Sequence, residues 1–189
     1  PNSNILGIDG KWINQNQLKI DKNFYVSLDL NKGISPEILK KKFDLTICLE
    51  TLSDIKLENS LNLLNQICNI SDHVLFSSGT PIQNHEPHVN QKWQSFWVNE
   101  FKKRKFVLAD IIRSEVWDNK EGSPWLKQNC FLFFNEKINS TNFIKTSLPL
   151  NLVHPDLVDI NFLKLKKKKF LNFIIRIINK FSKLFNNFK

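Results

Sequence analysis

The chain has 189 residues, of which 41% are hydrophobic and 24% charged, and its formal net charge is +9. This length suffices for one domain with an appendage, because domains typically have about 100 to 200 residues. Nine of the 27 Lys and Arg residues lie in residues 160–189, where Asp and Glu are absent, and the other 18 equal the 18 acidic residues before them. Because residues 1–159 are neutral as a whole, the composition argues against a nucleic-acid-binding body.

The three cysteines, Cys48, Cys68 and Cys130, lie far apart, without the short spacing of zinc sites and redox motifs. We predict buried, reduced thiols in a cytoplasmic protein, and no metal site. The first residues do not have the pattern of a signal peptide, and Met is absent from the whole chain, position 1 included. We therefore expect the chain to begin inside a longer protein.

The first half of the chain alternates between short apolar runs and breaks. Asp9-Gly10 ends the first run, and Ser35-Pro36 has the pattern of a helix start with proline at the first helical position. The predicted elements are, in chain order, a strand at 4–8, a strand at 24–30, a helix at 34–42 and a strand at 43–49.

The second half continues the alternation of helix and strand. Its first helix begins near Asp54 and is expected to bury one face, formed by Ile55, Leu61, Leu64, Ile67 and Cys68. The elements expected after it are a strand at 73–78, a helix at 91–105, a strand at 106–112 and a strand at 130–134. This order predicts an α/β fold with an open, doubly wound, mostly parallel sheet in residues 1–158, followed by a separate segment at 159–189.

Three of the predicted strands have an acid at or near the carboxyl end: Asp9, Asp29 and Glu50. Ligands of open α/β sheets bind outside the carboxyl ends of the strands, and a carboxylate there can accept two hydrogen bonds from neighbouring ribose hydroxyls. One such acid alone is better explained as the cap of the next turn. Three acids after successive strands favour a nucleotide-like ligand.

Several segments resemble class I S-adenosylmethionine-dependent methyltransferases. The later ones are similar to a bacterial branch associated with the modification of surface polysaccharides or small metabolites. The resemblance covers residues 4 to 156. Its segments are Gly7–Trp12, Ser27–Leu30, Phe43–Glu50, His73–Pro81, His88–Trp97 and Gln128–Phe134.

This resemblance implies a seven-stranded sheet whose last strand, at 130–134, is antiparallel. The first strand and the glycine-rich loop after it would precede Asn4. S-adenosylmethionine would be the cofactor, with Asp9 on the ribose hydroxyls, Asp29 beside the adenine and Glu50 near the methionine end. The residues predicted to contact the cofactor are Asp9, Gly10, Trp12, Asp29, Leu30 and Glu50.

The segment from His85 to Trp97 is the predicted acceptor site. His88 is the expected general base and Asn90 the residue that orients the acceptor, with His85 and Trp93 as further contacts. The alternative is that Trp93 and Trp97 pack on one helix face and that His88 is structural. Two histidines three residues apart, without a nearby third ligand, do not predict a metal site.

Residues 160–189 combine the basic run Lys166–Lys169 with apolar residues at helical spacing. A basic amphipathic helix of this kind lies on an anionic membrane surface, here the inner face, or docks on its own domain or another subunit. The sequence leaves both open. The apolar residues are Phe170, Ile174, Ile177, Ile178, Phe181, Leu184, Phe185 and Phe188.

The sequence therefore predicts methyl transfer from S-adenosylmethionine to an oxygen of a small molecule or glycan. Where such enzymes commonly have a Glu-His pair after the third acid, this chain has Ser53-Asp54. That departure keeps a second hypothesis open, a non-catalytic scaffold or partner subunit attached to a membrane. An RNA methyltransferase is the third, since the fold alone does not select the substrate.

Overall fold

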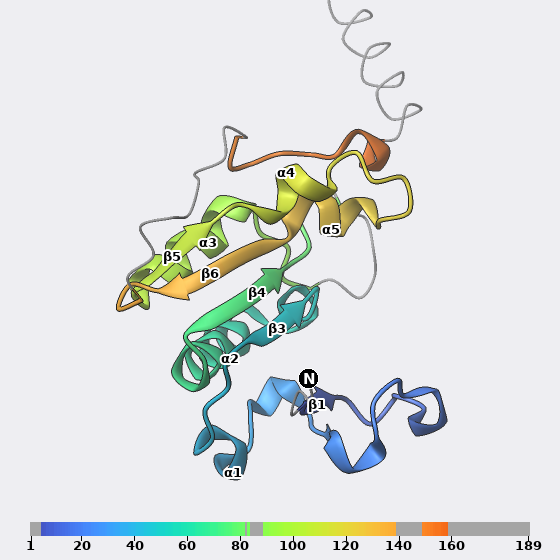
Figure 1. The fold of residues 1–189 in the computed structure, drawn as a ribbon, viewed down its shortest axis with the longest axis vertical. Coiled ribbons are helices and arrows are strands. Elements are labelled where there is room, and N and C mark those ends of the chain that lie inside the picture. Colours follow the sequence, from blue (N-terminus) through green and yellow to red (C-terminus); the bar gives the residue numbers. More distant parts are fainter. Residues whose placement is uncertain (1–4, 82, 84–88, 139–148, 159–189) are drawn as a thin grey trace, which may run out of the picture. The chain divides into compact units, whose positions relative to one another are not determined.

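The structure, a computed structural model, describes residues 5–81, 83, 89–138 and 149–158 (Figure 1). The chain divides after Leu152 into two compact units, which are described separately. In the second unit the described residues, 153–158, contain a 3-10 turn at Pro155–Leu157. The predicted amphipathic helix of residues 160–189 lies outside the described residues.

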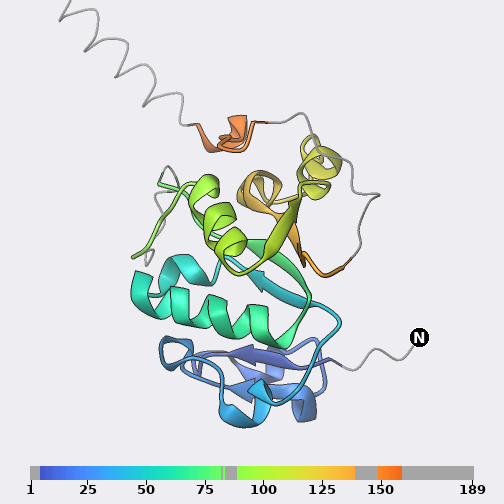
Figure 2. The same cartoon turned by 90° about the vertical axis from the view of Figure 1, so that its left-hand side faces the viewer.

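The first unit contains two separate sheets. The smaller one pairs β1 (Gly7–Asp9) with β2 (Tyr25–Ser27) in parallel. The larger one has four strands in the order β3 (Thr46–Leu49), β4 (His73–Ser77), β6 (Phe131–Asn135) and β5 (Phe106–Ala109). Figures 1 and 2 show the small sheet on the β3 side of the large one.

Strand β6 is the last strand among the described residues and lies between β4 and β5, antiparallel to both. The pairs β1–β2 and β3–β4 are parallel. The described residues therefore form a mixed α/β structure with mostly parallel strands and without a barrel. This confirms the predicted α/β class, and β6 is antiparallel to its neighbours, as the resemblance implies for residues 130–134.

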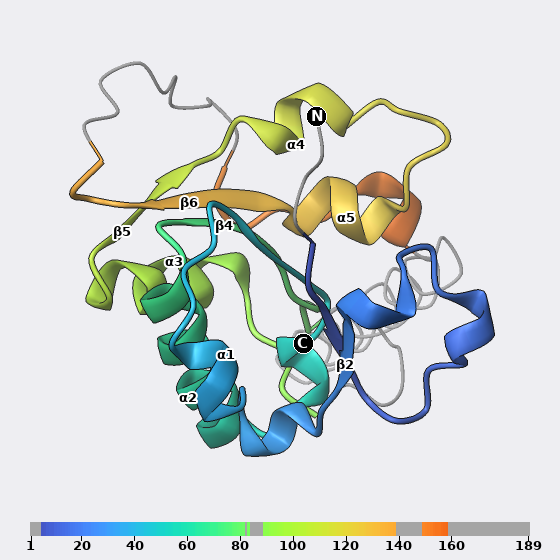
Figure 3. The same cartoon turned by 60° about the horizontal axis from the view of Figure 1, so that its bottom comes forward.

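The helices of the first unit differ greatly in length. Figure 3 shows the short helix α1 lying beside the long helix α2. None of the helices within the described ranges has both the length and the apolar character that crossing a membrane requires. The helices are α1 (Pro36–Leu39), α2 (Leu57–Ile70), α3 (Gln94–Lys103), α4 (Ile112–Val116) and α5 (Pro124–Asn129).

One face of the four-stranded sheet carries the core. Phe76 of β4 lies 5.4 Å from Trp97 of α3 between ring centroids, and Phe133 of β6 stacks on Phe101 at 3.8 Å. Leu64 of α2 is buried in the same cluster. Helices α2 and α3 therefore cover this face (Figure 2).

The other face is less completely covered. Ile47 of β3 pairs with Leu75 of β4, and Leu75 with Leu132 of β6, so these three side chains lie on one face. Ile47 is 60% exposed and Val107 of the edge strand β5 is 44% exposed. A parallel sheet that is covered on both faces would bury such residues.

Two predicted elements differ from those observed. The strand expected at 106–112 ends at Ala109, because Asp110 turns away to pair with the fully buried Arg113 of α4. On α2 the buried stripe is shifted: Leu61 and Cys68 are half-buried, whereas Leu63, Leu64, Ile67 and Ile70 face the core. The periodicity predicted the helix, and packing against the sheet set its rotation.

Candidate functional site

Glu50 follows β3 with a backbone φ of 56°, in the left-handed region that residues other than glycine seldom adopt. Its backbone N–H donates to the Ser77 carbonyl at 3.0 Å and to Ser77 Oγ at 3.1 Å, which ties it to the end of β4. Gln83 Nε2 donates to Glu50 Oε2 at 3.4 Å. The predicted cofactor residue Glu50 is thus fixed by residues distant in sequence.

A group of buried side-chain amides lies at the same end of the sheet. We call it the amide cluster; its members are Gln83, Gln94, Gln128 and Asn129, each less than a tenth exposed. Asn129 Oδ1 accepts from Gln128 Nε2 at 2.9 Å and from Gln94 Nε2 at 3.2 Å. Gln94 begins α3, Gln128 and Asn129 end α5, and Gln83 lies in the loop after β4, so three separate segments bring these amides together.

The amide cluster was not predicted from the sequence. Gln128 and Asn129 entered only as part of a resembling segment, and Gln83 was not singled out. The one local pattern that points to the cluster is the Gln-Asn pair directly before an apolar strand. Amide side chains have no periodicity of their own, so their convergence is a property of strand order.

Asn90, predicted to orient the acceptor, is buried and bonded to the backbone. Its Nδ2 donates to Ser60 Oγ at 3.0 Å and to the Leu52 carbonyl at 3.3 Å. The backbone N–H groups of Val89 and Asn90 both donate to the Ser53 carbonyl at 2.9 Å. Asn90 therefore fastens its segment onto the turn that follows Glu50.

The two tryptophans of this segment have different environments. Trp93 precedes α3 and is 37% exposed, whereas Trp97 is buried against Phe76 and Phe96. Trp97 is thus a core residue, as the packing alternative predicts for one of the pair. His85 and His88 lie outside the described residues.

Asp9, Gly10 and Trp12 form a second group, at the end of β1. Asp9 Oδ1 accepts the Gly10 N–H at 2.6 Å, and the Asp9 carbonyl accepts the Leu28 N–H at 2.9 Å. The Trp12 indole lies against Gly10: a Cβ at Gly10 would be 2.1 Å from the ring. Trp12 is nevertheless 73% exposed. An open aromatic surface thus sits beside a strand-end carboxylate.

Asp29 caps the turn that follows it. Its Oδ1 accepts the Asn31 N–H at 3.1 Å, and Lys32 Nζ lies 4.0 Å from its Oδ2. Leu30, the other predicted adenine neighbour, is half-buried and packs against the core. The geometry of Asp29 is that of the capping alternative. Because β1 and β2 pair in parallel, Asp9 and Asp29 follow adjacent strands, whereas Glu50 follows a strand of the other sheet.

The three thiols are poor nucleophiles. Burial raises the pKa of Cys48 to about 12 despite a hydrogen bond with Thr51, and the Glu50 charge adds to the rise. Burial and the Glu50 charge likewise raise the pKa of Cys130 to about 11. Burial raises that of Cys68 to about 12. The Glu50 charge therefore contributes to the raised pKa of both Cys48 and Cys130.

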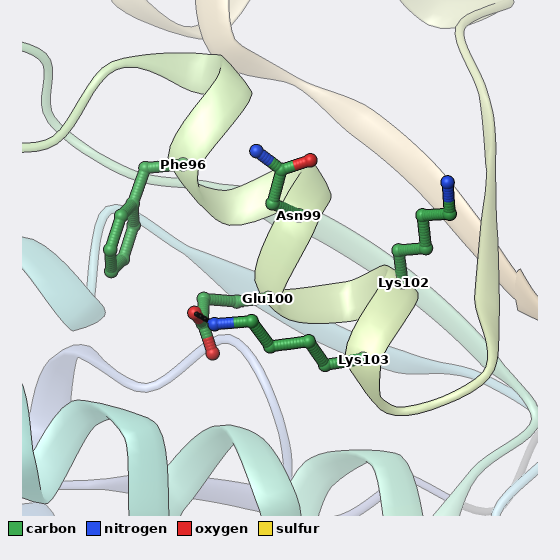
Figure 4. Close-up of a pocket in the computed structure, with 5 residues that line it drawn as sticks. All are labelled: Phe96, Asn99, Glu100, Lys102 and Lys103. Carbon is green, nitrogen blue, oxygen red and sulfur yellow. Dashed lines mark hydrogen bonds and ion pairs between the residues drawn. The ribbon is translucent and has the colours of Figure 1, made fainter.

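The hollow drawn in Figure 4 lies elsewhere, on α3. Lys103 turns toward Glu100, with 2.6 Å between Nζ and Oε1 (Figure 4). Within the described ranges, no group of three or more His, Cys, Asp or Glu residues could hold a metal ion. The residues that line the hollow are Phe96, Asn99, Glu100, Lys102 and Lys103, none of which is at a strand end.

No protein-family model matches the chain, and no curated protein matches it. The two groups at the strand ends are therefore the structural basis for proposing a function.

Proposed function

We propose that this domain transfers a methyl group from S-adenosylmethionine to an oxygen of a small molecule or glycan. The observation that carries the proposal is the left-handed backbone of Glu50 at the end of β3. A side chain in the left-handed region costs roughly 1 kcal/mol, and such strain is concentrated at ligand sites. Glu50 lies where ligands of open α/β sheets bind, and the resemblance assigns it to the cofactor.

The strand order supports the finer fold that the resemblance implies. Strands β1 and β3 are each an edge strand of their sheet, and the small sheet lies on the β3 side of the large one (Figure 1). One further parallel strand between β1 and β3 would join the six described strands into a seven-stranded sheet with an antiparallel last strand. That strand would bring the glycine-rich loop to the ends of β1 and β3. It would also cover the edge beside Ile47.

Asp9, Gly10 and Trp12 fit a nucleoside. The Trp12 indole offers an open face for an adenine ring. Asp9 Oδ2 has no hydrogen bond to any described residue and could accept one from a ribose hydroxyl. Asp29, which already caps its own turn, fits less well, so Asp9 is the better supported ribose residue.

S-adenosylmethionine would supply the methyl group from its sulfonium, and S-adenosylhomocysteine, a neutral thioether, would be the leaving group. An O–CH3 bond forms as the S–CH3 bond breaks, and the acceptor hydroxyl loses its proton. The chain's part is to align the acceptor and to take this proton. Gln83 contacts Glu50, and Asn90 is bonded to the turn after it. His88 is the proposed base, with His85 and Trp93 as acceptor contacts, on the ground of the sequence pattern alone.

Titration calorimetry of the chain with S-adenosylhomocysteine tests the proposal. Asp9→Asn keeps an acceptor for the Gly10 N–H but removes the charge, and we expect the affinity to fall about tenfold or more. Asp21→Asn is the matched control, because Asp21 also caps its own turn, at 2.9 Å from the Asn23 N–H, but does not follow a strand. Absence of binding, or equal effects of the two substitutions, would contradict the proposal.

One observation favours the non-catalytic alternative. Where the resembling enzymes have the glutamate of a Glu-His pair, Ser53 is fully buried, and its Oγ donates to the Glu50 carbonyl at 3.0 Å. The Ser53 carbonyl also accepts the two N–H groups of Val89 and Asn90. This position thus holds the turn together. A chain that binds S-adenosylhomocysteine but methylates no hydroxyl acceptor would support a scaffold.

A further inference from the structure

The orientation of the Gln83 amide is fixed by a backbone group. Gln83 Oε1 accepts the Thr80 N–H at 2.8 Å, and the Thr80 hydroxyl lies 3.1 Å from the same oxygen. A backbone N–H can only donate, so the atom facing it must be the oxygen of the amide. The Nε2 group is therefore the end that faces Glu50 Oε2 at 3.4 Å.

The same argument fixes Asn129. Because Gln83 Oε1 is an acceptor, the Asn129 atom 2.7 Å from it must be the nitrogen Nδ2. Asn129 Oδ1 then accepts the bonds from Gln94 and Gln128. Donation runs in one direction, from these two amides to Asn129, on to Gln83, and finally to the carboxylate of Glu50.

Filling this part of the core with a series of hydrogen-bonded amides is energetically costly. Buried amides lose their hydration, and well-packed apolar residues of similar shape can be as stabilising. The cluster even leaves Gln94 Oε1 without a hydrogen-bond partner in the described part of the chain. What an apolar replacement could not provide is a set of aligned dipoles whose positive ends face Glu50.

We propose that Gln83 is a positioning residue, held by Asn129, that fixes the Glu50 carboxylate at the ligand site. The proposal rests on the proposed function, because it gives Glu50 a cofactor to contact. Gln83 acts through Glu50 and does not itself need to touch the ligand. Asn129 acts one step further away, through Gln83.

An exchange of the two residues tests the contact without any ligand. Gln83→Glu keeps an oxygen for Thr80 and Asn129 but sets a second carboxylate against Glu50, and we expect the unfolding equilibrium constant to rise about tenfold or more. Adding Glu50→Gln to this variant restores a hydrogen bond between the two positions, now with residue 50 as the donor and residue 83 as the acceptor. The double variant should regain most of the lost stability in urea titrations, or regain soluble expression if Gln83→Glu alone does not fold. A double variant no better than Gln83→Glu would overturn the proposal.

Ligand affinity separates positioning from mere packing. Gln83→Met removes the donor to Glu50, and we expect S-adenosylhomocysteine to bind about tenfold more weakly. Ser71→Ala is the control: its buried Oγ donates to the His73 carbonyl at 2.7 Å, at the opposite end of β4. This variant should lose stability but not affinity.

The two failures are distinguishable. If the unsubstituted chain binds the ligand and Gln83→Met binds it equally well, the role of Gln83 is overturned and the proposed function stands. If the unsubstituted chain does not bind, the proposed function is overturned, and with it the ligand role of Gln83. The exchange of residues 50 and 83 still reports in that case whether the contact exists.

Discussion

The acids at the ends of the two sheets look alike in the sequence but are held differently. Asp9 and Asp29 accept hydrogen bonds from residues one and two positions further on. Glu50 is held by Ser77 and Gln83, which are 27 and 33 residues away. An acid after a strand can thus be a local cap or the end point of a tertiary network, and sequence proximity alone does not distinguish the two.

The two sheets also differ in how they are stabilised. Between residues 5 and 32 only Gly10 is buried, whereas β4 and β6 are mostly buried. A two-stranded sheet is marginal by itself, so β1 and β2 depend on the core that Ile8 and Val26 reach. The first unit therefore combines a well-packed half with a half that has little core of its own.

Large-to-small substitutions should separate these halves most clearly. Phe133→Ala removes a fully buried ring stacked at 3.8 Å on Phe101, and we expect the unfolding free energy to fall by about 3 to 5 kcal/mol. Phe24→Ala, beside β2, removes a ring that is 49% exposed and should cost less than about 1 kcal/mol. Urea titrations followed by circular dichroism measure both; equal losses would show that the small sheet carries as much of the core.

Acid should weaken the two halves unequally. Burial raises the pKa of Glu100, but the hydrogen bonds from Lys103 and Arg104 outweigh it, so this pKa lies below its ordinary value. The stabilisation is then fully present above the ordinary Glu pKa of about 4.3 and is lost as the pH falls through the lowered pKa. Glu100→Gln should cost about 1 to 3 kcal/mol at neutral pH and progressively less in acid.

The substitution that matches Glu100→Gln next to the small sheet is Asp29→Asn, just after β2. Asp29 caps its turn and has an exposed partner, Lys32, at 4.0 Å, and asparagine caps equally well. The unfolding free energy of this variant should stay within about 0.5 kcal/mol of the original at every pH. If the loss of unfolding free energy caused by Glu100→Gln is also independent of pH, the hydrogen bonds around Glu100 are not the interactions that acid weakens.

The smallest effects are expected at Glu50 and Lys105, the two residues other than glycine that have a positive φ in the described part of the chain. Lys105→Gly relieves a φ of 64° after α3 and loses only an exposed ion pair with Glu136, so we expect a gain of about 0.5 to 1 kcal/mol. Glu50→Gly relieves a φ of 56° but leaves the Gln83 donor unmatched. Its stability should therefore fall below that of Lys105→Gly by about 1 kcal/mol. Equal gains in urea titrations would mean that the Glu50 side chain contributes nothing to the fold.

Much of the element order could be predicted. The apolar period of α2 and the apolar runs at β3, β4 and β6 are local patterns, and each element formed within a few residues of its predicted position. Helix α4 was not predicted, because it depends on the burial of Arg113 against Asp110 and the carbonyls of Pro149 and Leu150. Those carbonyls lie more than 30 residues away, beyond any local pattern.

The sequence by itself determined the alternation of helix and strand and the positions of the strand-end acids, because these follow from side chains a few positions apart. Only the tertiary structure decided that β6 lies between β4 and β5, and with it that Asn129 meets Gln83 beside Glu50. Pairing between distant strands is selected by the packing of the whole core. The partners of the partly buried Glu50 carboxylate are therefore set by that packing and not by its neighbours in the chain.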